Sequence, residues 1–214
     1  MGVKVENMTM DEARGLVSDR LLWPFIRDFL WDFAPQVHPS WVDAAALREM
    51  KSPRVKRHVL SSLGVEPCFH AFPKEDGSRL LLLGGETLES VAKWLGALAC
   101  ADALRRVTSG ATVRELKAAL PGVYPDVFGY TMYFREFAPR GDAEAQSLQA
   151  EVVEEGASLL LSALSSLPAS LVSRLKFKPP RGFCDPVAQR EIKLSSIYKL
   201  LKLKFPEAYK VCCS

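Results

Sequence analysis

The stretch LESVAKWLGALACADALRR, residues 88–106, decides the fold of this chain. Its apolar residues recur at the three- and four-residue intervals of an amphipathic helix. At 100° per residue, one face of that helix collects Leu88, Val91, Ala92, Leu95, Leu98 and Ala99. We therefore predict a long apolar helix that begins at Thr87 and ends near Val107.

An aspartate interrupts the apolar face of this helix. Asp102 falls in its middle, and Arg106 lies one turn further on. An exposed pair at this spacing contributes only about 0.2–0.5 kcal/mol, whereas stranding one partner of a buried pair costs roughly 3–5 kcal/mol. We predict a shielded contact between Asp102 and Arg106 that fixes the helix or an interface. An ordinary ion pair at a helix end is the alternative.

Helix signals also dominate the rest of the chain. Capping boxes and residues favoured at first helical turns predict helix starts at Thr9, Ser40, Ser52, Thr112, Asp142 and Asp185. Pro24 is predicted to end or kink the first of these helices. Gly64 is predicted to stop the third, and Pro121-Gly122 the one that starts at Thr112. Residues 121–141, rich in proline, glycine and aromatics, are predicted to form a packed loop with short helical pieces.

Only one region looks extended. PCFHAFP and RLLLLGG flank the turn sequence KEDGS, which is typical of a small β-hairpin near residues 67–83. The fold class that follows is all-α, a single-domain irregular helical bundle with this one hairpin. Residues 1–25 form an N-terminal extension or helix, and residues 26–214 form the helical domain.

The composition excludes several classes of protein. With 48% hydrophobic and 25% charged residues, the chain is typical of a globular protein and not of a disordered one. No apolar run approaches the ~18 residues of a membrane-spanning helix. The first residues, MGVKVENMTMDEARGL, contain no apolar core of a secretory signal. We expect a cytoplasmic protein whose five cysteines are free thiols.

The sequence holds few candidates for chemistry. It has no GxGxxG, Walker A or HExxH motif, and its three histidines do not have metal-ligand spacing. Cys68 and His70 would point to the same side of a strand, so a small cysteine-dependent hydrolase remains a hypothesis. His38, between Val37 and Pro39, is interpreted as a structural residue satisfied by the backbone. We expect no enzyme activity, no metal and no cofactor.

Charge is unevenly distributed along the chain. Residues 174–214 hold ten Lys or Arg against three Asp or Glu, while the net charge of the whole chain is +3. This basic tail on a mildly acidic body favours an acidic partner, a membrane surface or nucleic acid. A solvated helix face is the alternative interpretation.

The last predicted helix is apolar on two sides. Leu194, Ile197, Tyr198, Leu201 and Phe205 form one stripe; Ile192, Leu200 and Leu203 form the other. Lysines that include Lys199 and Lys202 lie between the stripes. A surface helix needs only one apolar stripe. The second is therefore either part of the core or a surface kept for a partner, and we hypothesise the partner surface.

Several segments resemble, in order, the SctK (YscK/PscK-like) family of bacterial type III secretion. FAPQVHPSW, residues 33–41, resembles an amino-terminal signature of that family. Residues 88–120 resemble its central segment, where Asp102 takes the place of an acidic residue and Arg105 and Arg106 match an arginine pair. LPASLVSRLKFKPP, residues 167–180, and KLLKLKFPEAYKVCC, residues 199–213, are similar to its later runs. The first 25 residues are not covered.

The resemblance implies a function that the residues alone do not give. SctK-like proteins are non-catalytic helical adaptors of the cytosolic sorting platform beneath the injectisome. They link the inner-membrane ring protein SctD to the pod protein SctQ, which connects through SctL to the ATPase SctN. The chain would then lie in the cytoplasm, peripheral to the inner membrane. The residues we assign to partner binding are Asp102, Arg105, Arg106, Ile192, Lys199, Leu200, Lys202 and Leu203. A basic, helical, nucleic-acid-binding regulator is the alternative function.

Overall fold

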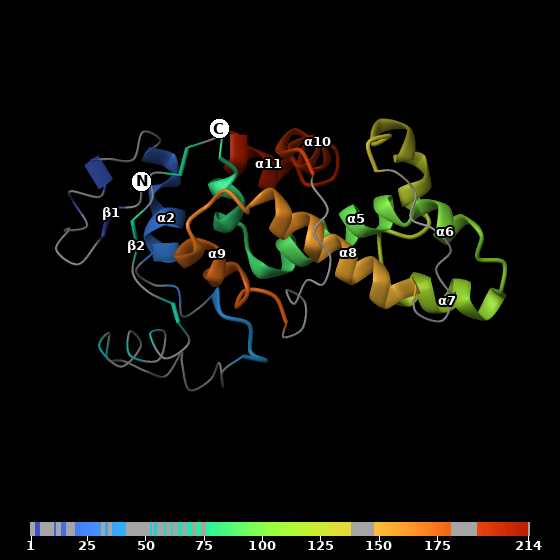
Figure 1. Ribbon diagram of the computed structural model, residues 1–214, viewed down its shortest axis with the longest axis horizontal. Helices are drawn as coiled ribbons and strands as arrows, with labels where there is room; N and C mark the ends of the chain where they lie inside the picture. Colours follow the sequence, from blue (N-terminus) through green and yellow to red (C-terminus); the bar gives the residue numbers. More distant parts are fainter. Residues whose placement is uncertain are drawn as a thin grey trace. The chain divides into compact units, whose positions relative to one another are not determined.

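Helices make up most of the described chain, which confirms the expected mainly α fold (Figure 1). The computed structural model describes residues 3–4, 11, 14–15, 20–30, 33, 36–41, 52, 54, 58, 61, 64–65, 68–69, 72–73, 76–137, 148–180 and 192–213. The α-helices are α2 (Trp23–Leu30), α5 (Gly85–Ala99), α6 (Ala101–Arg105), α7 (Gly110–Ala119), α8 (Leu148–Ala163), α9 (Ala169–Leu175), α10 (Leu194–Lys204) and α11 (Pro206–Cys213). Short 3-10 helices are η1 (Arg20–Leu22), η3 (Ser78–Leu82), η4 (Asp126–Gly129) and η5 (Thr131–Tyr133).

The hairpin expected at residues 67–83 is wrong. Its first half does contain a strand, β2 (Cys68–Phe69), but β2 pairs antiparallel with β1 (Val3–Lys4) near the start of the chain. Its second half, RLLLL, belongs largely to η3 and is almost wholly buried. Gly77, with φ 76°, precedes this helix. The prediction failed because a continuous apolar run in the sequence does not distinguish a buried strand from a buried helix.

The described chain divides into two compact units. Unit 1 comprises Met1–Leu88, Leu164–Gly182 and Lys202–Ser214, and unit 2 comprises Glu89–Ala163 and Phe183–Leu201. Two of the boundaries between them pass through α5 and α10, and a third falls at the end of α8. The expected division into an extension at residues 1–25 and one domain at 26–214 stays a prediction.

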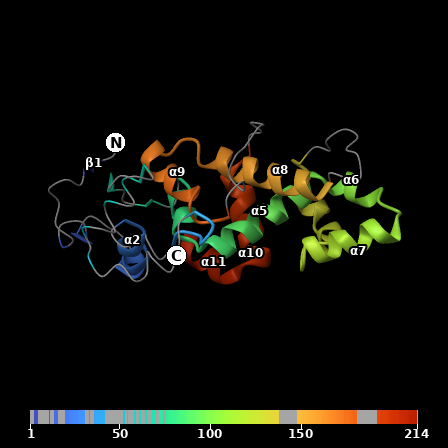
Figure 2. The same ribbon diagram turned by 90° about the horizontal axis from the view of Figure 1, so that it is seen from below.

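In unit 2, α5 and α8 lie side by side, as both ribbon views show (Figure 2). They meet through two glycines. A Cβ added to Gly96 would collide with the carbonyl oxygen of Val152, and one added to Gly156 would collide with that of Ala92. The backbones therefore approach as closely as they do only because both positions lack a side chain.

Burial along α5 confirms the apolar face predicted for it. All six residues of that face are at most 3% exposed. Trp94 and Ala97 are buried as well, so the helix is enclosed on more sides than its periodicity indicated. The expected single helix ending near Val107 is interrupted at Cys100, after which α6 begins.

In unit 1, η3 contacts α2, α9 and α11. Two buried cations reinforce this centre. Arg174 on α9 donates from Nη1 to the carbonyl oxygen of Phe29 on α2, at 2.6 Å. Lys178 donates from Nζ to the carbonyl oxygens of Leu81 and Leu83, at 2.5 and 2.7 Å. These bonds tie three separate segments of the chain together through backbone carbonyl oxygens.

The stretch FAPQVHPSW packs against the same part of unit 1. The backbone N–H of His38 donates to the carbonyl oxygen of Phe177 at 2.8 Å, and Trp41 donates from Nε1 to that of Pro179 at 2.9 Å. The Nδ1 atom of His38 accepts from the backbone N–H of Ser40 at 3.1 Å. The interpretation of His38 as a structural residue satisfied by the backbone is confirmed.

Several predicted helix boundaries need correction. Pro24 lies in the first turn of α2, where a proline interrupts no helical hydrogen bond, so it does not end a helix there. Helix α7 begins at Gly110, which leaves Thr112 inside the helix instead of at its cap. It ends at Ala119 before Pro121-Gly122, as expected. Helix α9 was missed because its seven residues are too few to show a clear period.

Other predictions fall partly on residues that the structure does not describe. Arg54, His58 and Ser61, the described residues between Ser52 and Gly64, are helical, and Gly64 has φ 75°. The continuous helix between them stays a prediction. The starts at Thr9, Asp142 and Asp185 lie outside the described residues, as do residues 42–50 of the helix after Ser40. Among the described residues, no helix combines the length and apolar character needed to cross a membrane.

Candidate partner-binding site

Helix α6 carries the aspartate that the sequence singled out. Asp102 pairs with Arg105, three residues on, with 3.2 Å between Nη1 and Oδ1. The side chains are 45% and 47% exposed. The predicted shielded contact with Arg106 is thus wrong in both partner and burial, because α6 ends at Arg105 and Arg106 is its exposed C-cap. The pair is the ordinary helix-end type, worth a few tenths of a kcal/mol.

Arg105 also joins α6 to the segment that contains η4 and η5. Its Nη2 atom donates to Oγ1 of Thr131 at 2.7 Å, and the Thr131 hydroxyl donates to the carbonyl oxygen of Phe128 at 3.1 Å. The guanidinium lies 5.5 Å from the centre of the Phe128 ring, within cation–π range. Arg105 is therefore held on three sides.

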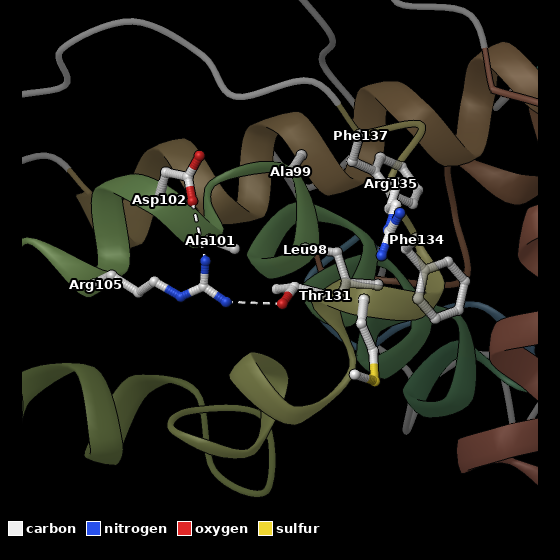
Figure 3. A pocket seen from close by; sticks show the side chains of 10 residues that line it. Leu98, Ala99, Ala101, Asp102, Arg105, Thr131, Phe134, Arg135 and Phe137 are labelled. Atoms are coloured by element: carbon white, nitrogen blue, oxygen red, sulfur yellow. Dashed lines mark hydrogen bonds and ion pairs between the residues drawn. The ribbon is translucent and has the colours of Figure 1, made fainter.

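Between α6 and this segment lies a pocket of about 260 Å³, the α6 pocket (Figure 3). Four of its lining residues are buried and apolar: Leu98, Ala99, Ala101 and Phe134. The others are exposed or half-buried: Asp102, Arg105, Thr131, Met132, Arg135 and Phe137. In Figure 3 Asp102 and Arg105 lie on one side of Leu98, and Phe134 and Arg135 lie on the other. The pocket thus has an apolar interior and a charged edge.

Apolar surface is exposed at the edge of the pocket, on the lining residue Met132 and on Tyr133, which follows it in the chain. The side chain of Met132 is 63% exposed and that of Tyr133 is 48% exposed. Arg135 is exposed too, and within the described residues its guanidinium has no hydrogen bond or ion pair. Methionine, tyrosine and arginine are the residue types enriched at protein interfaces.

Helix α10 forms hydrogen bonds to the segment that carries Met132, Tyr133 and Arg135. Lys199 donates from Nζ to the carbonyl oxygen of Tyr133 at 2.5 Å and lies 5.3 Å from the centre of the Phe134 ring. The Ser196 hydroxyl donates to Oε1 of Glu136 at 2.6 Å. Lys199, predicted to contact a partner, thus has a clear role within unit 2.

The other predicted site residues do not gather in one place. Leu200 is fully buried, which places it in the core rather than on a surface, while Ile192 is half-buried. Lys202 and Leu203 belong to unit 1, where Lys202 is exposed and Leu203 is 43% exposed. Of the eight residues, the structure brings only Asp102 and Arg105 together at the α6 pocket.

Sequence reasoning missed the pocket residues that follow α7. Thr131, Met132 and Arg135 lie in and after η5, whose three residues are too short to show a helical period. The signal that was present is the run YTMYFREF, residues 130–137, which combines four aromatic residues with a methionine and an adjacent arginine and glutamate.

The basic tail is only partly a surface feature. Arg174 and Lys178, two of its ten cations, are 1% and 2% exposed in unit 1. Burial, and then the neighbouring Arg174, lower the pKa of Lys178 from 10.5 to about 7. At the surface, Lys210 pairs with Glu207 at 2.7 Å. The tail is therefore less basic toward solvent than its composition indicated.

The hypothesis of a cysteine-dependent hydrolase has no described geometry. His70 lies outside the described residues, and the structure gives only the backbone of Cys68, in β2.

Comparison with protein families gives one clear match. The family described as YOP proteins translocation protein K (YscK) matches residues 30–210, which is most of the chain and includes both units. Searches among curated proteins and solved structures gave no match. The family match covers the first three segments that carried the resemblance and residues 199–210 of the fourth. The chain therefore belongs to the YscK family, the SctK proteins of bacterial type III secretion.

Proposed function

We propose that this protein is a non-catalytic structural adaptor of the cytosolic sorting platform of the type III secretion system. It links the cytoplasmic domain of an SctD-like inner-membrane ring protein to an SctQ-like pod protein, and through that protein, indirectly, to SctL and the SctN ATPase. It works in the cytoplasm at the inner membrane. Membership of the YscK family is the observation that carries this proposal.

Exposed apolar side chains in both units support an adaptor with two binding surfaces. In unit 1, Leu21 is 79% exposed and Phe25 is 45% exposed. In unit 2, Met132 and Tyr133 lie beside the α6 pocket. Large apolar side chains that lie close together at a surface are typical of sites where proteins dock.

The test uses purified full-length protein with the SctQ-like protein and the cytoplasmic domain of the SctD-like protein from the same organism. Each pair is measured by isothermal titration calorimetry, and the three proteins together by size-exclusion chromatography with light scattering. We expect the adaptor to bind each of the two proteins. We also expect the SctQ-like and SctD-like proteins to elute as one complex only when the adaptor is present. Binding to neither protein overturns the proposal, and mutually exclusive binding overturns the linking role.

A further inference from the structure

The size of the α6 pocket fits a side chain better than a small-molecule ligand. Its volume of about 260 Å³ falls below the roughly 300–1,000 Å³ of typical ligand clefts. The buried residues Leu98, Ala101 and Phe134 give it an apolar interior. An apolar side chain that enters such an interior is removed from water, which favours binding.

The charges at the edge of the pocket favour a binding partner that carries a carboxylate next to its apolar side chain. Oδ1 of Asp102 and Nη1 of Arg105 form an ion pair at 3.2 Å, so the two charges largely neutralise one another. Arg135 lies on the other side of Leu98 and is exposed, with no ion pair within the described residues. One cation is thus left over, and its planar guanidinium suits a carboxylate.

The surface around the pocket is already ordered. Arg105 holds the Thr131 hydroxyl, and Lys199 holds the backbone carbonyl of Tyr133. The segment that presents Met132 and Arg135 is therefore fastened at both α6 and α10. A site fixed in advance loses less conformational entropy when a partner binds.

We propose that the α6 pocket is an anchor site for a partner protein. It receives one apolar side chain from a segment of that partner, and a carboxylate next to this side chain pairs with Arg135. Met132 adds apolar contact at the edge of the pocket. The proposal rests on the adaptor function proposed above and assigns one of its two binding surfaces to unit 2.

The experiment compares two pocket variants with a matched control. Arg135→Glu reverses the charge at the edge of the pocket, and Met132→Asp places a charge on the exposed apolar edge. Arg114→Glu makes the same charge change at an exposed position of α7 in the same unit. Arg135→Lys keeps the charge. Each full-length variant is titrated calorimetrically against the SctQ-like protein and the SctD-like cytoplasmic domain, after circular dichroism and thermal melting establish that it folds.

We expect Arg135→Glu and Met132→Asp each to weaken binding to one of the two proteins by about tenfold or more, a change typical of an interface anchor. Binding to the other protein, and binding by Arg114→Glu, should stay within about threefold. Arg135→Lys keeps the charge but loses the planar guanidinium, so its affinity should lie between those of wild type and Arg135→Glu. If wild type binds and both pocket variants bind equally well, the anchor site is wrong and the adaptor function stands. If Arg114→Glu weakens binding as much as Arg135→Glu does, general charge explains the effect and the anchor site is wrong. If wild type binds neither protein, the adaptor function fails, and the anchor site fails with it.

Discussion

At the residue scale, the cations in the core of unit 1 donate hydrogen bonds to backbone carbonyls. Arg79 donates from Nε to the carbonyl oxygen of Phe72 at 2.9 Å, and Arg174 and Lys178 make similar bonds. A carbonyl satisfies a donor but does not neutralise its charge, so a buried ammonium stays costly to protonate. The lowered pKa of Lys178 follows from this environment.

Lys178 should make the stability of the protein depend on pH. Its pKa is about 7 in the folded chain and near its ordinary 10.5 when unfolded. Between these values the unfolded chain binds more protons, so the free energy of unfolding rises with pH, by up to about 1.4 kcal/mol per unit. We expect this rise in urea unfolding between pH 7 and 8.5, and we expect Lys178→Met to abolish most of it.

Lys176 provides the control, because it lies two residues away and is exposed. Lys176→Met should keep the pH dependence of the wild type. Burial raises the pKa of the Cys212 thiol to about 12, with a smaller contribution from Cys213. Because of that shift, the free energy of unfolding falls with rising pH once the thiol ionises in the unfolded chain. Urea unfolding is therefore measured only below pH 8.5. A wild-type curve that is flat between pH 7 and 8.5 would contradict the burial of a protonatable Lys178.

At the element scale, the contact between α5 and α8 should tolerate no side chain at its centre. In Gly96→Ala the new Cβ meets the carbonyl oxygen of Val152, so the helices must separate. We expect the free energy of unfolding to fall by roughly 1–3 kcal/mol, as for other overpacked cores. Gly110→Ala, in α7, is the control, since a Cβ there meets no atom within 4 Å. Equal thermal midpoints for the two variants would disprove the close contact.

Helix α10 offers a second pair of variants. Leu200 is 0% exposed, whereas Leu203, one turn on, is 43% exposed. We expect Leu200→Asp to unfold the protein, because an aspartate there would be buried without a partner. Leu203→Asp should leave the thermal midpoint within a few degrees of wild type. If circular dichroism shows that both variants fold, Leu200 does not lie in the core.

The helix periods of the sequence predicted the core better than the site. Leu88, Val91 and Leu95 are buried as expected, because the apolar face of an amphipathic helix packs against the core. The partner of Asp102 could not be predicted in the same way. The break at Cys100 makes α6 a separate five-residue helix, and a fixed 100° step carries no information about such a break. Likewise, only the structure distinguishes the buried Lys178 from the exposed Lys176 in LKFKPP.

At the scale of the whole molecule, the basic tail is the feature that composition overstated. Two of its cations lie in the core, and Lys199 holds the carbonyl oxygen of Tyr133. We expect weak binding to a 20-nucleotide single-stranded DNA, measured by fluorescence anisotropy at 50 and 200 mM salt. Tight binding that falls by about a thousandfold or more over this range would instead favour the nucleic-acid hypothesis.

Membership of the YscK family is an inference from the chain as a whole and not from any one segment. The resemblance rested on four segments in order, and the family match spans residues 30–210. The α6 pocket was not predicted, because its wall comes from residues 98–105 and 131–137, which only folding brings together.

The meeting of Gly96 and Gly156 has a consequence for how this protein tolerates mutation. The atom that blocks a side chain at either position is a carbonyl oxygen, which every amino acid carries. Replacing Val152 or Ala92 with a smaller residue therefore leaves the obstacle in place. A genetic screen for suppressors of a Gly96 variant should recover changes that strengthen unit 2 elsewhere, and none that restore the lost fit locally.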